Sequence, residues 1–207
     1  MVKPKKEEAS TEQQILEAAR KIFREKGFDG ARMQEIADEA KINKAMLHYY
    51  FRSKDQLFRR IFVETMQSFL GTIVLLLNQP SSTWEEKIYA IAERYTDFLK
   101  SNPGMPLFVM SELARSGHSV IEDLPVSAVV ESSVFIRQLR EEQRKKRVRE
   151  IEPLQVIITI ISGLVFPFVA RPIIKTIGQF DDKKFNRFLE DRKIIVAEML
   201  ITYLRKK

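Results

Sequence analysis

The chain has no cysteine, and its only histidines, His48 and His118, lie far apart in the sequence. Without thiolates it cannot build a disulfide framework, a cysteine zinc site, an iron–sulfur cluster or a cysteine nucleophile. It also lacks a glycine-rich phosphate loop, an HExxH pair and a serine nucleophile elbow. We therefore expect no catalytic residue, no metal and no cofactor, and we predict that the protein is not an enzyme.

Glycine and proline are scarce, at 7 and 8 of 207 residues, which excludes collagen-like and low-complexity chains. With 44% hydrophobic and 30% charged residues, the chain is long enough to fold around a core. Its net charge of +7 permits a polyanionic partner such as nucleic acid or an anionic membrane surface. Residues 1–60 hold 14 basic and 10 acidic residues, so charge alone does not choose the partner.

One stretch reaches the lower edge of membrane-spanning length, because residues 153–170 contain no charged side chain over 18 positions. Gly163, Pro167 and several polar residues interrupt it, which favours a buried helix. No apolar segment follows the N-terminal lysines as a secretory signal requires, so we expect a cytoplasmic protein. A membrane-associated helical protein that uses residues 153–170 is the alternative hypothesis.

The spacing of apolar residues is helical along nearly the whole chain, which predicts an all-α fold of about nine helices. Thr11, Ser53 and Thr83 are each followed three residues later by Gln or Glu, the spacing of a capping box at a helix start. The expected helices cover residues 11–26, 33–40, 44–51, 53 onward, 83–101, 105–116, 125–149, 153 onward and 183–206. Residues 156–161 are the only strand-like run, and they have no partner run.

Two short helices, at 33–40 and 44–51, are separated by a three-residue joint and preceded by a longer helix. Ile36 and Ala37 point inward from the first, Ile42 fills the joint, and Leu47 and Phe51 anchor the second, with Asn43 as its N-cap. This arrangement is typical of a helix-turn-helix, which places its second helix in the major groove of DNA.

Residues 10–60 also carry a set of positions at fixed spacing: Thr11, Ile15, Ala19, Phe23, Gly27-Phe28, Ile36-Ala37, Ala40, Ile42, Leu47, Tyr50-Phe51, Ser53-Lys54 and Leu57. This pattern resembles the N-terminal domain of the TetR/AcrR family of bacterial transcriptional regulators. The resemblance implies a DNA-binding domain at residues 1–56, and an effector-binding and dimerisation domain at 57–207. It further implies a homodimer that binds a palindromic operator, most simply a repressor released by a small, largely apolar effector.

The chain departs from the family pattern at three places. Ala31-Arg32 stands where hydroxyl residues usually cap the second helix, and Lys41 stands where glycine is commonest in the joint. His48-Tyr49-Tyr50 replaces the usual order, which begins with tyrosine. We expect the first two departures to cost about 1 kcal/mol each, and the third to alter individual base contacts.

The resemblance implies which side chains contact DNA. Gln34 can pair with an adenine edge, Lys44 with a guanine or a phosphate, and Met46 with a thymine methyl group. The full set is Gln34, Lys44, Ala45, Met46, His48, Tyr49, Tyr50 and Lys54, of which His48, Tyr49 and Lys54 suit phosphates.

The second domain has weaker signatures. By analogy with the family, the effector pocket would be lined by residues between 60 and 140; the candidates are Tyr95, Phe98, Phe108, Met110, Ser111 and Phe135. The last two helices would pair with their mates in a four-helix dimer bundle; the candidate dimer contacts are Val156, Ile160, Leu164, Ile195 and Met199. We interpret the basic run at residues 144–149 as a helix end and loop rather than as a second nucleic-acid patch.

Overall fold

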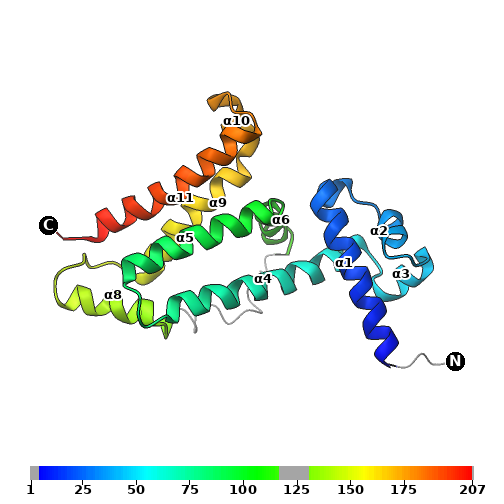
Figure 1. Ribbon diagram of the computed structural model, residues 1–207, viewed down its shortest axis with the longest axis horizontal. Coiled ribbons are helices and arrows are strands. Elements are labelled where there is room, and N and C mark those ends of the chain that lie inside the picture. Colours follow the sequence, from blue (N-terminus) through cyan, green and yellow to red (C-terminus); the bar gives the residue numbers. More distant parts are fainter. Residues whose placement is uncertain (1–4, 117–130, 207) are drawn as a thin grey trace. The chain divides into compact units, whose positions relative to one another are not determined.

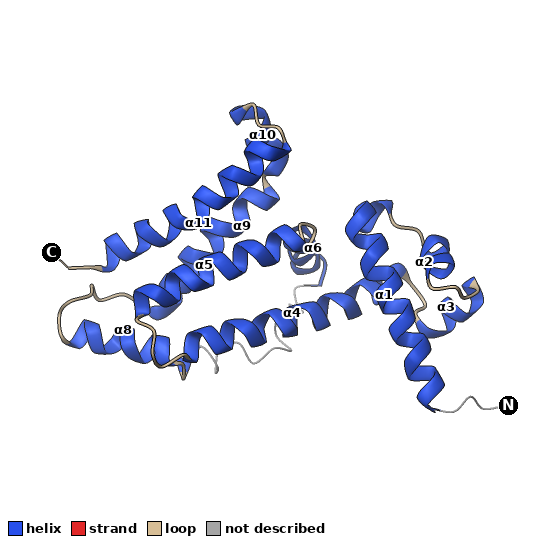
Figure 2. Ribbon diagram, in the orientation of Figure 1, coloured by secondary structure: helices blue, strands red, loops and turns tan. Residues whose placement is uncertain are grey.

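Ten helices make up most of the part of the chain that the computed structural model describes, residues 5–116 and 131–206 (Figure 1). The side chains of residues 5–9 and 111–116 are outside this description. The helices are α1 (Lys5–Gly30), α2 (Met33–Glu39), α3 (Lys44–Tyr50), α4 (Lys54–Asn78), α5 (Trp84–Ser101), α6 (Met105–Ser116), α8 (Val134–Arg144), α9 (Pro153–Val169), α10 (Arg171–Gly178) and α11 (Asp182–Leu204). The all-α prediction is confirmed, and Figure 2 shows helices joined by loops alone in the described residues.

Side-chain caps begin three of the helices as the sequence predicts. Asn43 Oδ1, Ser53 Oγ and Thr83 Oγ1 each accept a hydrogen bond from the amide three residues later, at 2.7, 3.1 and 3.2 Å. The cap expected at Thr11 was wrong, because α1 begins at Lys5 and Thr11 lies inside it. The residues before Thr11 include two lysines, two glutamates and an alanine, which all favour a helix and let it start earlier.

The chain divides into two compact units, residues 1–67 and 68–207, with α4 running through the division. In unit 1, α1, α2, α3 and the start of α4 enclose their own core. Its fully buried side chains include Ile15, Ala19, Ile36, Ala37, Leu47 and Leu57. The rings of Phe23, Phe28 and Phe58 add an aromatic cluster with centroids 4.9–6.1 Å apart. These contacts fix α2 and α3 on a rigid base.

Unit 2 is built on α5, α9 and α11, which pack side by side (Figure 1). Its main core joins α5 and α8 to the inner faces of α9 and α11, with Trp84 and Ile88 from α5 and Phe135 and Leu139 from α8. Lys87 is 1% exposed, and its ammonium group donates to the carbonyls of residues 79 and 82 and to the hydroxyl of residue 82. That lysine therefore fixes the connection between α4 and α5.

Three of the predicted dimer contacts lie on the inner face of α9, and their burial corrects the prediction. Val156, Ile160 and Leu164 are at most 2% exposed and pack in the core of the same chain. They cannot also contact a partner, because the interior is already filled. The outer face of α9 carries Leu154 and Ile158, which are 59% and 49% exposed.

A bend of 75° separates α9 from α10 at Ala170, just before the Pro172 of the second helix. By length and apolar composition, α4 could cross a membrane, and so could α9 and α10 if the bent pair formed one span. Core helices of proteins outside membranes pass the same test, and five side chains of α9 are buried inside the unit. The bend and this burial favour the core interpretation of residues 153–170.

The helix expected at residues 125–149 is shorter in the structure. Residues 125–130 lie outside the described part of the chain, and α8 spans Val134–Arg144. Lys145 ends it, and Lys146 has a positive φ of 58°. The basic run is therefore a helix end and a loop, as the sequence predicted.

Candidate nucleic-acid interface

Two exposed ion pairs hold α2 against α1. Lys21 Nζ lies 2.8 Å from Glu39 Oε1, and Lys26 Nζ lies 2.7 Å from Glu35 Oε1. The hydrogen bond from Lys26 lowers the pKa of Glu35, and the hydrogen bond to Glu39 raises the pKa of Lys21. Both shifts favour the charged form of the shifted group, and the two ion pairs join α2 to α1.

The turn between α2 and α3 uses a residue with a positive φ. Lys41 has φ 54°, and its amide donates to the carbonyl of Asp38 while the amide of Ile42 donates to that of Ala37. This is the Schellman arrangement, in which glycine is the favoured residue at the left-handed position. The sequence predicted a cost at Lys41, and the turn nevertheless forms, with Ile42 half-buried beside it.

Helix α3 presents one outward face. Leu47 is 0% exposed and anchors the inner face, whereas Tyr49 is 75% exposed. Lys44, Ala45 and His48 are exposed beside Tyr49, while Met46 and Tyr50 are half-buried at the edge of the same surface. The rings of Tyr49 and Tyr50 meet edge to face with centroids 5.3 Å apart. The structure therefore brings together all six α3 residues that the sequence singled out.

Gln34 lies exposed near the start of α2, where its Nε2 donates to Asp38 Oδ1 at 2.8 Å. This bond lies on the surface, so the amide can exchange it for another partner. Arg32 is the N-cap of α2 and makes no side-chain cap bond, as the departure from the family pattern predicts. Its backbone amide instead donates to Glu35 Oε2 at 3.3 Å.

The side chain of Lys54 makes hydrogen bonds within unit 1. Its ammonium group donates to the carbonyl oxygens of Phe28, Asp29 and Ala31 at 2.7, 3.4 and 3.1 Å. It also lies 4.5 Å from the centroid of the Phe28 ring. These contacts join the first residue of α4 to the end of α1 and to Ala31, which follows it, a role that the sequence did not reveal. The DNA contact implied for Lys54 stays a prediction.

Replacing Lys54 with methionine should lower the free energy of unfolding by about 1–3 kcal/mol, because two partly buried hydrogen bonds and one exposed hydrogen bond to carbonyl groups are lost. Urea unfolding of the full chain measures this. Lys44→Met, which removes an exposed lysine from α3, serves as the control and should leave stability unchanged. An unchanged stability in Lys54→Met, with weakened DNA binding, would show that the ammonium group serves DNA instead.

Three further exposed cations flank the α3 surface: Arg32, Lys41 and Arg52. None of their charged groups has an ion pair or hydrogen bond with a described residue. Arg32 is the N-cap of α2 and Arg52 lies two residues before α4, so both lie near a helix start, where a phosphate can be bound. Arg52 directly precedes the predicted cap Ser53, and Arg32 stands at a capping position of the family pattern; these positions are the signals by which sequence reasoning could have found them.

Two predicted effector residues do lie together in unit 2. The rings of Tyr95 and Phe98 on α5 stack with the ring of Phe69 on α4. The centroid of the Phe69 ring lies 5.1 Å from that of Tyr95 and 4.1 Å from that of Phe98. Burial raises the pKa of Tyr95 to about 12, so its hydroxyl stays protonated at neutral pH. The stack is continuous with the apolar cluster of Leu99 and Phe168.

The other effector candidates are scattered. Phe135 is 0% exposed in the main core of unit 2, away from the aromatic stack, so it is a packing residue. Phe108 is half-buried and Met110 is 57% exposed, both on α6. The side chain of Ser111 lies outside the described residues. Helical spacing alone could not separate these environments.

The geometry of unit 1 defines a class of protein. A rigid base, a tight turn and a short helix with a lysine, a histidine and two tyrosines on its outer face form a helix-turn-helix DNA-binding unit. In the described part of the chain, no group of three or more metal-binding side chains lies close enough to hold a metal ion.

Comparisons with known proteins extend this conclusion. Residues 15–61 match the family model described as bacterial regulatory proteins, tetR family. The probable HTH-type transcriptional regulator YttP of Bacillus subtilis is 22% identical over 197 residues, covering 93% of this chain and 95% of that protein. The HTH-type transcriptional repressor NicS of Pseudomonas putida is 42% identical over 59 residues, 28% of each chain.

The fold agrees with these relatives. A putative TetR-family transcriptional regulator from Mesorhizobium loti, known from its crystal structure, superposes with a TM-score of 0.61 at 18% identity, covering 96% of this chain and 98% of that one. Residues 15–61 therefore match the DNA-binding region of the tetR family, and the chain shares its fold with a TetR-family regulator.

Proposed function

We propose that the protein is a cytoplasmic homodimeric repressor that binds a palindromic operator and is released by a small, largely apolar effector. The exposed face of α3 on a rigid three-helix base is the observation that carries this proposal. The division into a DNA-binding domain at residues 1–56 and an effector and dimerisation domain at 57–207 belongs to the proposal. The name of NicS supports repression as the outcome.

Each DNA contact in this proposal has a physical role. Lys44 and Tyr49 lie exposed on α3, where they can reach a base edge or a phosphate in the major groove. Ala45, Met46, His48 and Tyr50 complete the surface, and Gln34 approaches from α2. Arg32, Lys41 and Arg52 add positive charge around it, which suits phosphates on either side of the groove.

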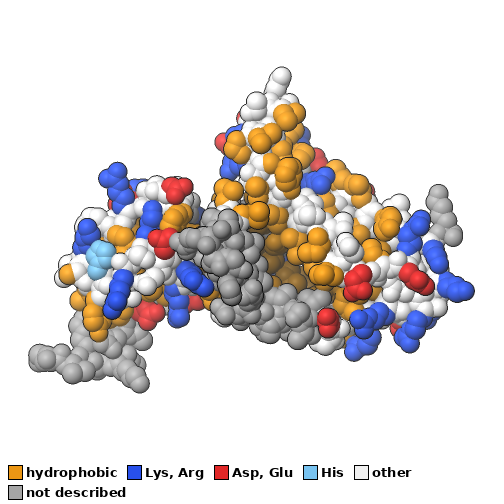
Figure 3. All heavy atoms as spheres, turned by 180° about the vertical axis from the view of Figure 1, so that it is seen from behind, with side chains coloured by type: hydrophobic (Ala, Val, Ile, Leu, Met, Phe, Trp, Pro, Cys, Tyr) orange, Lys and Arg blue, Asp and Glu red, His pale blue; other side chains and the backbone are white. Residues whose placement is uncertain are grey.

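The dimer contact falls on the outer faces of α9 and α11. Because these helices pack on each other and on α5, side chains that point away from α5 share one side of the layer. Ile195 and Met199 on α11 are 44% and 67% exposed, and Ile158 on α9 is 49% exposed. Figure 3 shows hydrophobic side chains gathered on this part of unit 2. An apolar surface of this kind suits a self-complementary contact between two copies.

The aromatic stack of Phe69, Tyr95 and Phe98 supports an effector site between α4 and α5. The hydroxyl of Thr96, beside Tyr95 in the chain, is buried and has no hydrogen-bond partner among the described residues. The stacked aromatic rings and the protonated hydroxyl group of Tyr95 suit an apolar ligand with one polar group. Release of DNA by such a ligand is measured in the same assay that detects DNA binding.

Lys44→Ala and Tyr49→Ala should each weaken binding to DNA from beside the protein's own gene by about 10- to 100-fold, because each removes a groove or phosphate contact. A gel shift at fixed salt measures this, and circular dichroism checks that the helices remain. Arg24→Ala removes an exposed cation from α1 and should change affinity much less. Equal losses in all three variants, or no specific complex with the native protein, would contradict the proposal.

A further inference from the structure

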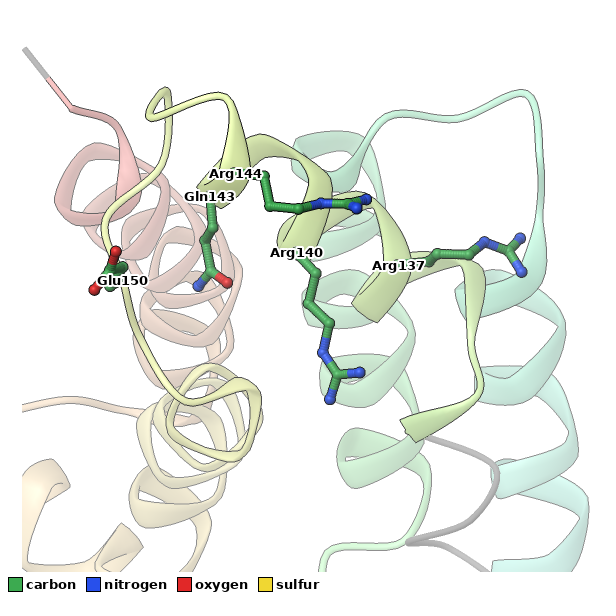
Figure 4. A pocket seen from close by; sticks show the side chains of 5 residues that line it. All are labelled: Arg137, Arg140, Gln143, Arg144 and Glu150. Carbon is green, nitrogen blue, oxygen red and sulfur yellow. The ribbon is translucent and has the colours of Figure 1, made fainter.

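A groove of about 520 Å³ lies along the outer side of α8, far along the chain from the helix-turn-helix. It is lined by Arg137, Arg140, Gln143, Arg144 and Glu150 (Figure 4). Its volume is within the range of small-ligand sites in proteins. Three of the five residues that line the groove are arginines, so its surface is charged, whereas the core behind it is apolar.

The three arginines stand on one face of α8, because residues three, four and seven apart in a helix lie on the same side. Arg137, Arg140 and Arg144 are all exposed, and their guanidinium groups form no ion pair or hydrogen bond with a described residue. The nearby carboxylates are already engaged, Glu141 with Lys145 and Glu142 with Arg147. This row of three arginines therefore has no ion-pair partner among the described residues, and Arg144 acts on Glu141 only as a secondary charge that helps to lower its pKa.

Helix stability does not explain this row. A cation in the last turn, such as Arg144, favours the helix dipole, but Arg137 lies in the first turn, where a positive charge is unfavourable. Arg140 and Arg144 are four residues apart, a spacing at which like charges repel. An anion bound in the groove would remove both penalties.

The groove is also held in shape before any ligand arrives. Gln143 Nε2 donates to the carbonyls of Arg149 and Ile151 at 3.2 and 2.9 Å, which fixes the loop at one end. The amide of Arg149 donates to the carbonyl of Leu204 at 2.8 Å, which ties this loop to the end of α11. A preformed wall lowers the entropy cost of binding.

We propose that this groove binds a small molecule that carries two or more phosphate groups. Guanidinium groups match phosphate oxygens with paired hydrogen bonds. Arg137 and Arg144 are separated by about 10 Å along the helix axis, a length that one phosphate cannot span and a chain of phosphates can. Glu150 lies at the end of the groove away from Arg137 (Figure 4), so the phosphates lie along the arginines.

Isothermal titration of the full chain at 0.15 M salt tests this proposal, with tripolyphosphate, a nucleoside triphosphate, orthophosphate and citrate as probes. The variant Arg137→Gln/Arg140→Gln/Arg144→Gln removes the row. The control Lys183→Gln/Lys184→Gln/Arg187→Gln removes the same charge from exposed positions on α11. We expect saturable binding of tripolyphosphate or the nucleotide, weakened on the order of tenfold per arginine in the first variant and little changed in the control.

Tripolyphosphate and the nucleoside triphosphate together distinguish the sources of the ligand. Tighter binding of the nucleoside triphosphate than of tripolyphosphate would assign the site to nucleotides, and the reverse to inorganic polyphosphates. Equal weakening in both variants, equal binding of citrate, or no saturable binding would overturn the proposal. So would loss of affinity for a random-sequence duplex in the arginine variant without any small-ligand binding, because the surface would then serve DNA.

Discussion

Replacing Met199 with arginine should turn the protein into a monomer and weaken operator binding by about 10²- to 10⁴-fold. Met199 is 67% exposed on the outer face of α11, where the proposed dimer would bury it. By two-fold symmetry one substitution places two unpaired charges in a single interface, and a buried charge without a partner is strongly destabilising. Once the dimer is lost, the second half-site no longer benefits from a linked binding unit.

Sedimentation or light scattering gives the oligomeric state, and a gel shift gives the affinity. Met110→Arg makes the same change on α6, where the methionine is 57% exposed, and should stay dimeric. A Met199→Arg protein that remains dimeric, or a Met110→Arg protein that becomes monomeric, would place the interface elsewhere.

The packing of α9 on α11 leads to the second large effect. A Cβ atom at Gly163 would lie 2.9 Å and 3.2 Å from the two γ-methyl groups of Val196, which is buried and has no flexible end to move. Gly163→Val should therefore lower the free energy of unfolding by about 2–3 kcal/mol, through forced separation of the helices. The carbonyl of Gly163 also accepts a hydrogen bond from Arg192 Nε at 3.1 Å, which the separation would lengthen.

Urea unfolding at one fixed protein concentration measures this loss, because the stability of the proposed dimer depends on concentration. Gly71→Val is the matched control, since a Cβ atom at Gly71 of α4 meets nothing within 4 Å. It should change stability by no more than about 0.5 kcal/mol. Equal losses at both glycines would show that helix context, not contact with Val196, decides the cost.

Local chemistry was predictable from the sequence. Asn43, Ser53 and Thr83 cap their helices because the cap depends on a side chain and an amide three residues away. The inward position of Leu47 followed from helical spacing with apolar residues on one side only. The cost at Lys41 was expected from the resemblance, because glycine is commonest at this place in the family pattern and a left-handed turn favours glycine.

In a helix that is apolar on all sides, the spacing of apolar residues does not indicate which side faces the core. In α9 the residues Val156 and Ile160 turned inward and Ile158 outward, yet all three look alike in sequence. Only the packing on α5 and α11 decides between them. Phe135 and Phe98 differ in the same way, since both are aromatic residues at helical spacing but only the second joins the stack with Phe69.

Lys54 shows a different limit. A lysine just after a predicted cap is consistent both with a phosphate contact and with an internal one, and its partners are carbonyl groups more than 20 residues away. Backbone acceptors leave no mark in the sequence, because every residue has one. The internal role of Lys54 therefore required the fold.

The position of the chain's single tryptophan gives unit 2 a spectroscopic signal of its own. Trp84 is 6% exposed in the core of unit 2, while unit 1 contains tyrosines but no tryptophan. Tryptophan emission therefore reports the loosening of unit 2 alone, whereas far-ultraviolet dichroism reports the helices of both units. Comparing the two signals during unfolding separates the stability of the DNA-binding part from that of the rest.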